Sequence, residues 1–167
     1  MGRDKALLPV AGTAMAVLVA DALRAGGCDP VVAIGGDPDA LGRLGLTTIA
    51  DRWPGEGPLG GVITALEHFD DLDAVVVAAC DLPRLSSTTV AALVSALTIG
   101  TDVAMAVTDR QQPLCAAWRP SAAVHLSAMF AVGGRRLLDA LGDLRVVDVS
   151  VAESQLINVN TAADLPG

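Results

Sequence analysis

Hydrophobic positions along the chain follow two patterns, short continuous apolar runs and longer stretches with apolar residues three or four positions apart. Short runs are typical of buried strands, and the wider spacing predicts amphipathic helices. The predicted strands are residues 30–34, 47–50, 74–79, 103–107, 114–118, 145–149 and 156–159. The predicted helices are residues 14–25, 38–44, 60–69, 87–97, 120–130 and 135–141, with a capped turn at 161–165.

Strands that alternate with helices predict a three-layer α/β/α Rossmann-like fold with a mostly parallel sheet. The run AVVVAA at residues 74–79 is the most strand-like and is expected in the middle of the sheet. The chain of 167 residues contains no repeat and no linker, so we expect one domain over residues 1–167. Ligands of such folds bind at the carboxyl ends of the strands.

Composition narrows the range of partners. Hydrophobic residues make up 52% of the chain but aromatic residues only 2%, and the net charge is −8. This charge argues against a nucleic acid or an anionic membrane as partner, while a few local donors could still bind a small phosphorylated ligand. Cys28, Cys80 and Cys115 lack metal-ligand spacing and are interpreted as small core residues in a reducing compartment. No apolar run is long enough for a membrane span or a signal peptide, so a cytoplasmic protein is expected.

Lys5 is the only lysine among eleven basic residues. A compact ammonium in place of a guanidinium suits polyphosphate chemistry. The alternative is a solvated charge near the N-terminus, and composition alone favours that alternative.

Residues 51–61, DRWPGEGPLGG, follow a predicted strand and precede a predicted helix. Glycines let the backbone approach an anion closely, and the start of a helix offers unpaired N–H groups. A plain surface connection explains the segment equally well. Trp53 within it would either stack on a base or cover the core.

Two further segments place polar residues after predicted strands. Asp81 follows the strand at 74–79 and is either a Mg²⁺ ligand or a turn former before Pro83. Asn158 and Asn160 alternate onto one face of a short strand and are either site groups or turn residues before a helix.

Five motifs occur in a fixed order: MGRDKALLPVAG, DxxPGxGPLGG, CDLP, QPLCAAWR and NVNTAADL. In this order and at these spacings they resemble the molybdenum cofactor guanylyltransferases of the nucleotidyltransferase superfamily, over nearly the whole chain. The resemblance implies transfer of GMP from GTP to Mo-molybdopterin, with release of pyrophosphate. It implies Mg²⁺ as cofactor, GTP and Mo-molybdopterin as substrates, and a molybdoenzyme or its chaperone as a further partner.

The resemblance also implies a role for each matching position. Lys5 and Asp81 become the catalytic residues, with Asp81 as the Mg²⁺ ligand. The nucleotide-binding residues become Lys5, Asp51, Gly57, Pro58, Leu59, Gly60 and Asp81. The acceptor-binding residues become Gln112, Pro113, Arg135, Arg136, Asn158 and Asn160.

The chain also departs from the family pattern. The family begins with a strand and a loop of the form LAGGxSxRMG, and this sequence opens at the final MG. The expectation is that Met1 is an internal residue of a longer protein; the alternative is a shortened, silent chain. Without that strand, its neighbours in the sheet should be unpaired and the nucleotide pocket open on one side.

The sequence also leaves undecided which nucleotide base is used and which molecule accepts the nucleotidyl group. Gly35 and Gly36 stand where the family often has an asparagine that contacts the nucleotide. Cytidylyl transfer, nucleotidyl transfer to another small acceptor, and a silent module that binds the finished cofactor are therefore alternatives.

Overall fold

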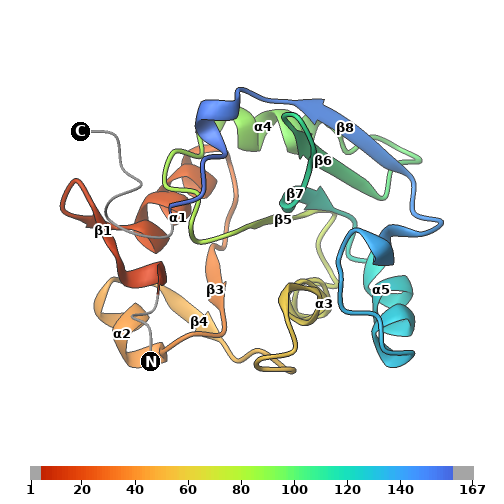
Figure 1. Ribbon diagram of the computed structural model, residues 1–167, viewed down its shortest axis with the longest axis horizontal. Helices are drawn as coiled ribbons and strands as arrows, with labels where there is room; N and C mark the ends of the chain where they lie inside the picture. The colour runs from red at the N-terminus through yellow and green to blue at the C-terminus, as the bar shows by residue number, and fades with distance from the viewer. Residues whose placement is uncertain (1–4, 160–167) are drawn as a thin grey trace.

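The structure is a computed structural model that describes residues 5–159. It has the α/β order expected from the sequence (Figure 1). The strands are β1 (Pro9–Val10), β2 (Thr13–Ala14), β3 (Val32–Ile34), β4 (Thr47–Ile49), β5 (Val75–Ala78), β6 (Val103–Val107), β7 (Gln111–Trp118) and β8 (Val146–Ser150). The helices are α1 (Met15–Ala25), α2 (Pro38–Arg43), α3 (Pro58–His68), α4 (Ser87–Ala96) and α5 (Ala122–Ala131), with short 3₁₀ turns η1 (Lys5–Leu7), η2 (Asp139–Leu141) and η3 (Glu153–Gln155). Within the described residues, no helix has the length and apolar character needed to cross a membrane.

Two predicted elements are wrong. The helix expected at 135–141 is reduced to the short turn η2, and the side chain of Arg135 bonds instead to the carbonyl of Phe130 and to Glu56. The strand expected at 156–159 is a loop, in which the Val159 N–H donates to the carbonyl of Asp81 at 3.0 Å and joins no strand ladder. The turn expected at 161–165 lies outside the described residues.

The larger sheet has the strand order β5–β7–β6–β8. We call it the β5–β8 sheet. β6 and β8 are parallel, whereas β7 runs antiparallel to both of its neighbours because it follows β6 through a short turn. The predicted α/β class is therefore confirmed, but this sheet is mixed. β5 lies at its edge and not in its middle as predicted.

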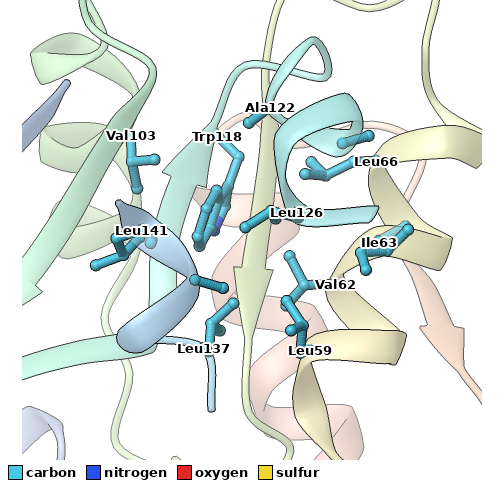
Figure 2. Packing of buried hydrophobic residues seen from close by; sticks show 14 of the residues in the cluster. Leu59, Val62, Ile63, Leu66, Val103, Trp118, Ala122, Leu126, Leu137 and Leu141 are labelled. Atoms are coloured by element: carbon cyan, nitrogen blue, oxygen red, sulfur yellow. The ribbon is translucent and has the colours of Figure 1, made fainter. Parts of the chain in front are cut away.

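Alternating side chains of the β5–β8 sheet face two helical layers. Val103, Met105 and Trp118 pack on one side with residues of α3 and α5, as Figure 2 shows for part of this cluster. Ala104 and Ala106 pack on the other side with residues of α1 and α4. This alternation gives the three layers expected from the sequence.

The smaller sheet contains the parallel pair β3 and β4, and we call it the β3–β4 sheet. No strand pairing joins β3 to β5 within residues 5–159. A cavity of about 590 Å³ lies between them, lined by Val32–Ile34, by residues 75–78 of β5 and by apolar side chains of α1 and α3. The expectation holds for one edge of each strand: β3 pairs with β4 and β5 with β7, but no described strand pairs with the edges that face the cavity.

Candidate functional site

Four residues predicted for the site meet around one pocket of about 390 Å³. They are Asp81, Gln112, Pro113 and Asn158. They come from three separate segments: the turn after β5, the start of β7 and the loop before the end of the described chain. One carboxylate and two amides in a single pocket can bind a metal ion, a phosphate or a polar ring system.

Backbone hydrogen bonds hold these segments together. The Val159 N–H donates to the carbonyl of Asp81 at 3.0 Å, and the Ala79 N–H donates to the carbonyl of Leu114 at 2.8 Å. The first bond ties the Asn158 loop to the turn that carries Asp81. The second ties that turn to β7, so the pocket is built on the edge of the β5–β8 sheet.

A bulge in β7 presents the acceptor-side residues. Met105 and Ala106 are adjacent in β6, yet their partners in β7 are Ala116 and Gln112. The residues between these partners include Pro113, which has no N–H to donate to a ladder. The bulge therefore interrupts the pairing at the position where Gln112 and Pro113 line the pocket.

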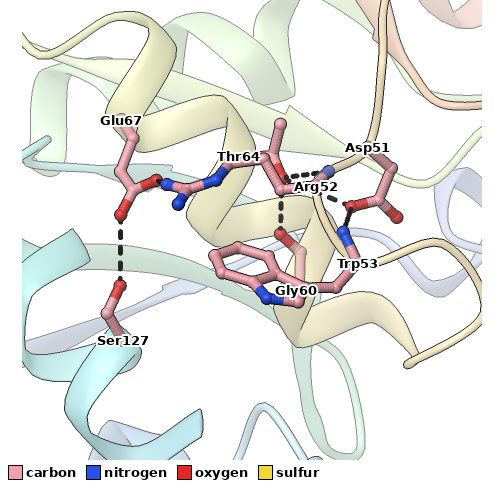
Figure 3. Close-up of polar contacts among 7 residues, drawn as sticks. All are labelled: Asp51, Arg52, Trp53, Gly60, Thr64, Glu67 and Ser127. Carbon is pink, nitrogen blue, oxygen red and sulfur yellow. Dashed lines mark hydrogen bonds and ion pairs between the residues drawn. The ribbon is translucent and has the colours of Figure 1, made fainter. Parts of the chain in front are cut away.

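Asp51 lies two residues after β4, and its carboxylate accepts a hydrogen bond from the backbone of its own loop. Its Oδ1 accepts from the Trp53 N–H at 3.0 Å and lies 3.3 Å from the Oγ1 of Thr64, as Figure 3 shows. Thr64 is only 4% exposed, and its Oγ1 also lies 3.0 Å from the carbonyl of Gly60. The loop that carries Asp51 is therefore fixed to α3 through a buried hydroxyl.

The predicted glycine-rich segment divides between two environments. Gly57, with a φ of 94°, precedes α3, and Pro58 is the first residue of this helix. Pro58 and Gly61 line the 590 Å³ cavity. Leu59 is fully buried in the core, and a Cβ added at Gly60 would meet the Cβ of Trp53 at 3.2 Å. The start of α3 thus borders the cavity, while Leu59 and Gly60 pack against neighbouring side chains.

The remaining predicted residues that the structure describes do not line the 390 Å³ pocket. Lys5 is an exposed residue of η1, next to Ala6, which lines the larger cavity. Arg135 forms an ion pair with Glu56, and Arg136 forms one with Asp139. Asn160 lies outside the described residues.

Sequence reasoning missed the role of Cys80 as a lining residue. It was expected in the core, but it is exposed and borders both the pocket and the larger cavity. Leu114 also lines both of these spaces. The place of Cys80 directly before Asp81 was the available signal. Cys115 matches the expectation, because it is buried in the core, and this burial raises the pKa of its thiol to about 12.

Comparison with known proteins identifies the family. Residues 1–146 match the model of the MobA-like NTP transferase domain. A probable molybdenum cofactor guanylyltransferase of Chloroflexus aggregans is 34% identical over an alignment of 149 residues that covers 83% of this chain and 71% of the relative. The molybdenum cofactor guanylyltransferase of Xanthomonas euvesicatoria is 31% identical over 166 residues, 96% of this chain and 83% of the relative. The chain belongs to the MobA-like NTP transferase family.

Solved structures place the fold in the same family. Molybdopterin-guanine dinucleotide biosynthesis protein A from Archaeoglobus fulgidus is 26% identical, with a TM-score of 0.77 over 98% of this chain and 87% of that one. The 2-C-methyl-D-erythritol 4-phosphate cytidylyltransferase of Thermus thermophilus has a TM-score of 0.73 at 19% identity, over 96% and 89% of the two chains. That likeness shows a shared nucleotidyltransferase fold.

Proposed function

We propose that this MobA-like protein transfers GMP from GTP to the phosphate of Mo-molybdopterin and releases pyrophosphate. The observation that carries the proposal is the pocket in which Asp81 meets Gln112 and Asn158, next to a cavity bordered by the start of α3. The relatives named as molybdenum cofactor guanylyltransferases, matched over 71% and 83% of their length, support this reaction over other nucleotidyl transfers.

The nucleotide binds on the β3–β4 side of the site. Pro58 begins α3, whose first turn supplies unpaired N–H groups and the positive end of the helix dipole. Asp51, held in place by Thr64, contacts the nucleotide, and Lys5 supplies a positive charge for the triphosphate. The N–H groups at the start of α3 and the ammonium of Lys5 stabilise negative charge without a covalent intermediate.

The acceptor binds on the opposite side, where Gln112, Pro113 and Asn158 line the pocket. Its phosphate oxygen attacks the α-phosphorus of GTP. The bond from that phosphorus to the bridging oxygen of the β-phosphate breaks, and this oxygen leaves with pyrophosphate. The protein needs only to position the two reactants and to neutralise charge.

Asp81 is the residue that would hold Mg²⁺. Within residues 5–159, no three His, Cys, Asp or Glu side chains gather as a metal centre. A single carboxylate still fits Mg²⁺, because this ion keeps waters and takes substrate phosphates as further ligands. Bound there, it would neutralise charge on the phosphates of GTP.

The test measures the pyrophosphate that is released when this chain is incubated with Mo-molybdopterin and either GTP or CTP. We expect release with GTP, dependence on Mg²⁺, and a loss of at least about 100-fold in Asp81→Asn, because removal of charge stabilisation has effects of that order. Asp71→Asn, at an exposed position between α3 and β5, is the matched control and should keep full activity. Release with CTP alone would support cytidylyl transfer, and cofactor binding without turnover would support the silent module.

A further inference from the structure

We propose that the C-terminal end of α5, through Phe130 and Arg135, holds the loop of residues 51–57 in the conformation that receives the nucleotide. We call this segment the nucleotide loop. The inference rests on the proposed function, because it assigns Arg135 to positioning on the nucleotide side of the site. The sequence alone had placed Arg135 on the acceptor side.

The nucleotide loop and α5 are joined by a continuous stack of cations and aromatic rings. The guanidinium of Arg52 lies 4.6 Å from the centre of the Trp53 ring. The rings of Trp53 and Phe130 lie 4.9 Å apart at an angle of 46°. The guanidinium of Arg135 lies 4.0 Å from the centre of the Phe130 ring. The stack runs from the loop to the segment after α5, and each contact favours a defined relative orientation.

Hydrogen bonds fix the Arg135 end of this stack. Its Nη1 donates to the carbonyls of Phe130 at 2.9 Å and Gly134 at 2.8 Å, and its Nε donates to Glu56 at 2.8 Å. The carbonyl of Phe130 is near the end of α5, where a cation is also favoured by the helix dipole. Arg135 thus links the end of α5 at Phe130 to Glu56 of the nucleotide loop.

A second link joins the same two elements. Arg52 forms an ion pair with Glu67 of α3, and the Ser127 hydroxyl of α5 donates to Glu67 at 3.3 Å (Figure 3). Together with the Thr64 hydroxyl under Asp51, these contacts attach the start of the loop to α3. The other end, near Glu56, is attached through Arg135.

The nucleotide loop needs such attachment because its own backbone is permissive. Gly55 has a φ of 84° and Gly57 a φ of 94°, and glycine loses the most conformational freedom on being ordered. A loop that is already ordered binds its ligand more tightly, since the ligand does not have to order it. Loss of Arg135 should therefore weaken nucleotide binding and leave the chemical step unchanged.

The experiment compares Arg135→Ala with Arg145→Ala in this chain. Arg145 is the matched control, because it also forms a 2.8 Å ion pair. Its partner is Asp102, and the two residues directly precede the paired strands β8 and β6 of the β5–β8 sheet. In Arg135→Ala we expect KM for GTP to rise about five- to tenfold, with kcat and KM for Mo-molybdopterin within about twofold. Hydrogen exchange of residues 51–57 should be faster. Arg145→Ala should change none of these quantities.

A charge reversal gives a rescue test. Glu56→Arg and Arg135→Glu should each raise KM for GTP, and the double variant should recover part of the loss because the ion pair is restored in reverse. Arg135→Lys should have an intermediate KM, since lysine keeps the charge but loses the planar face over Phe130.

Three results would overturn the inference. One is an unchanged KM for GTP in Arg135→Ala, and another is an equal rise in Arg145→Ala. The third is a rise confined to KM for Mo-molybdopterin, which would return Arg135 to acceptor binding. If the unaltered chain neither binds nor uses GTP, the proposed function fails, and hydrogen exchange in Arg135→Ala still decides whether Arg135 holds the loop.

Discussion

The β5–β8 sheet and the β3–β4 sheet are built from similar apolar strands but differ in what surrounds them. In the β5–β8 sheet, residues such as Met105, Ala116 and Trp118 are fully buried between two helical layers. In the β3–β4 sheet, all of β3 is only half-buried, and it borders the 590 Å³ cavity. Similar apolar strands are therefore fully buried where both of their edges are paired, and they are only half-buried where one edge faces a cavity.

Helices connect the two sheets, and no strand pairing joins them within residues 5–159. Residues of α1 and α4 share one apolar cluster, and α3 contacts both β3 and β5. Residues of the 390 Å³ pocket lie at the end of the β5–β8 sheet, whereas the nucleotide loop follows β4. The proposed acceptor side thus has the firmer support, and the proposed nucleotide side depends on helix contacts and on loop attachment.

The largest expected effect contrasts two leucines. Leu126 of α5 is fully buried against the β5–β8 sheet, and Leu41 of α2 is 2% exposed in the small cluster beside the cavity. Leu126→Ala should lower the free energy of unfolding by about 4 kcal/mol and Leu41→Ala by about 2 kcal/mol, because a site next to an existing cavity loses fewer contacts. Urea denaturation measures both. Equal losses would show that the two sheets are equally well packed.

The next effect concerns the contact between α1 and α4. A Cβ added at Gly26 would lie 2.5 Å from the Cβ of Val90, which is fully buried. Gly26→Ala should therefore cost about 2 kcal/mol, since the helices must move apart.

Gly42→Ala is the control for this contact. Gly42 lies within α2, and an added Cβ there meets nothing within 4 Å. Alanine should stabilise this helix by about 0.5 kcal/mol. Thermal unfolding of both variants tests the contrast, and a tolerated Gly26→Ala would mean that α1 is free to shift on α4.

A smaller effect compares one substitution in two places. Ala116→Val enlarges a side chain that is fully buried in the β5–β8 sheet and should cost about 1.5 kcal/mol. Ala33→Val enlarges a side chain of β3 that lines the cavity, where there is room. It should change the free energy of unfolding by less than about 0.5 kcal/mol or raise it slightly. A loss at Ala33 as large as that at Ala116 would mean that the cavity is filled in solution.

The sequence predicted the elements well where apolar runs were long and buried. The strand at residues 103–107 and the helix at 14–25 agree with β6 and α1. The failures occur where side-chain contacts override local pattern. Residues 135–141 have helical spacing, but Arg135 bonds to the end of α5 and to Glu56. That contact spans 79 positions from Glu56 to Arg135, so no local window contains it.

The site was also predictable only in part, because local motifs can be recognised in a sequence and long-range contacts cannot. Asp81, Gln112 and Asn158 each stood at a recognisable motif, and the structure brings them to one pocket. The attachment of the nucleotide loop was not predictable, because it depends on Phe130 and Thr64 facing Trp53 and Asp51 across the fold. A threonine within an otherwise apolar helical pattern was the one local signal.

The smallest effect tests whether an ion pair adds to the free energy of unfolding through the β5–β8 sheet. Asp102, just before β6, accepts hydrogen bonds from the backbone N–H of Arg145 and from its side chain at 2.8–2.9 Å. The side-chain bonds from Arg145 are the main cause that lowers the pKa of Asp102 to about 2. Asp102→Asn should cost about 1 kcal/mol at pH 7, a typical value for a partly exposed pair.

The sign of the pH dependence follows from the lowered pKa of Asp102. The folded protein holds this carboxylate ionised more strongly than the unfolded chain does, where its pKa is about 3.9. The stabilisation is therefore complete above about pH 4 and is lost as the pH falls toward 2. The difference in free energy of unfolding between the unaltered protein and Asp102→Asn should shrink over this range. A difference for Asp102→Asn that is constant from pH 5 to 2 would show that packing around β6, and not the ion pair, holds this edge of the sheet.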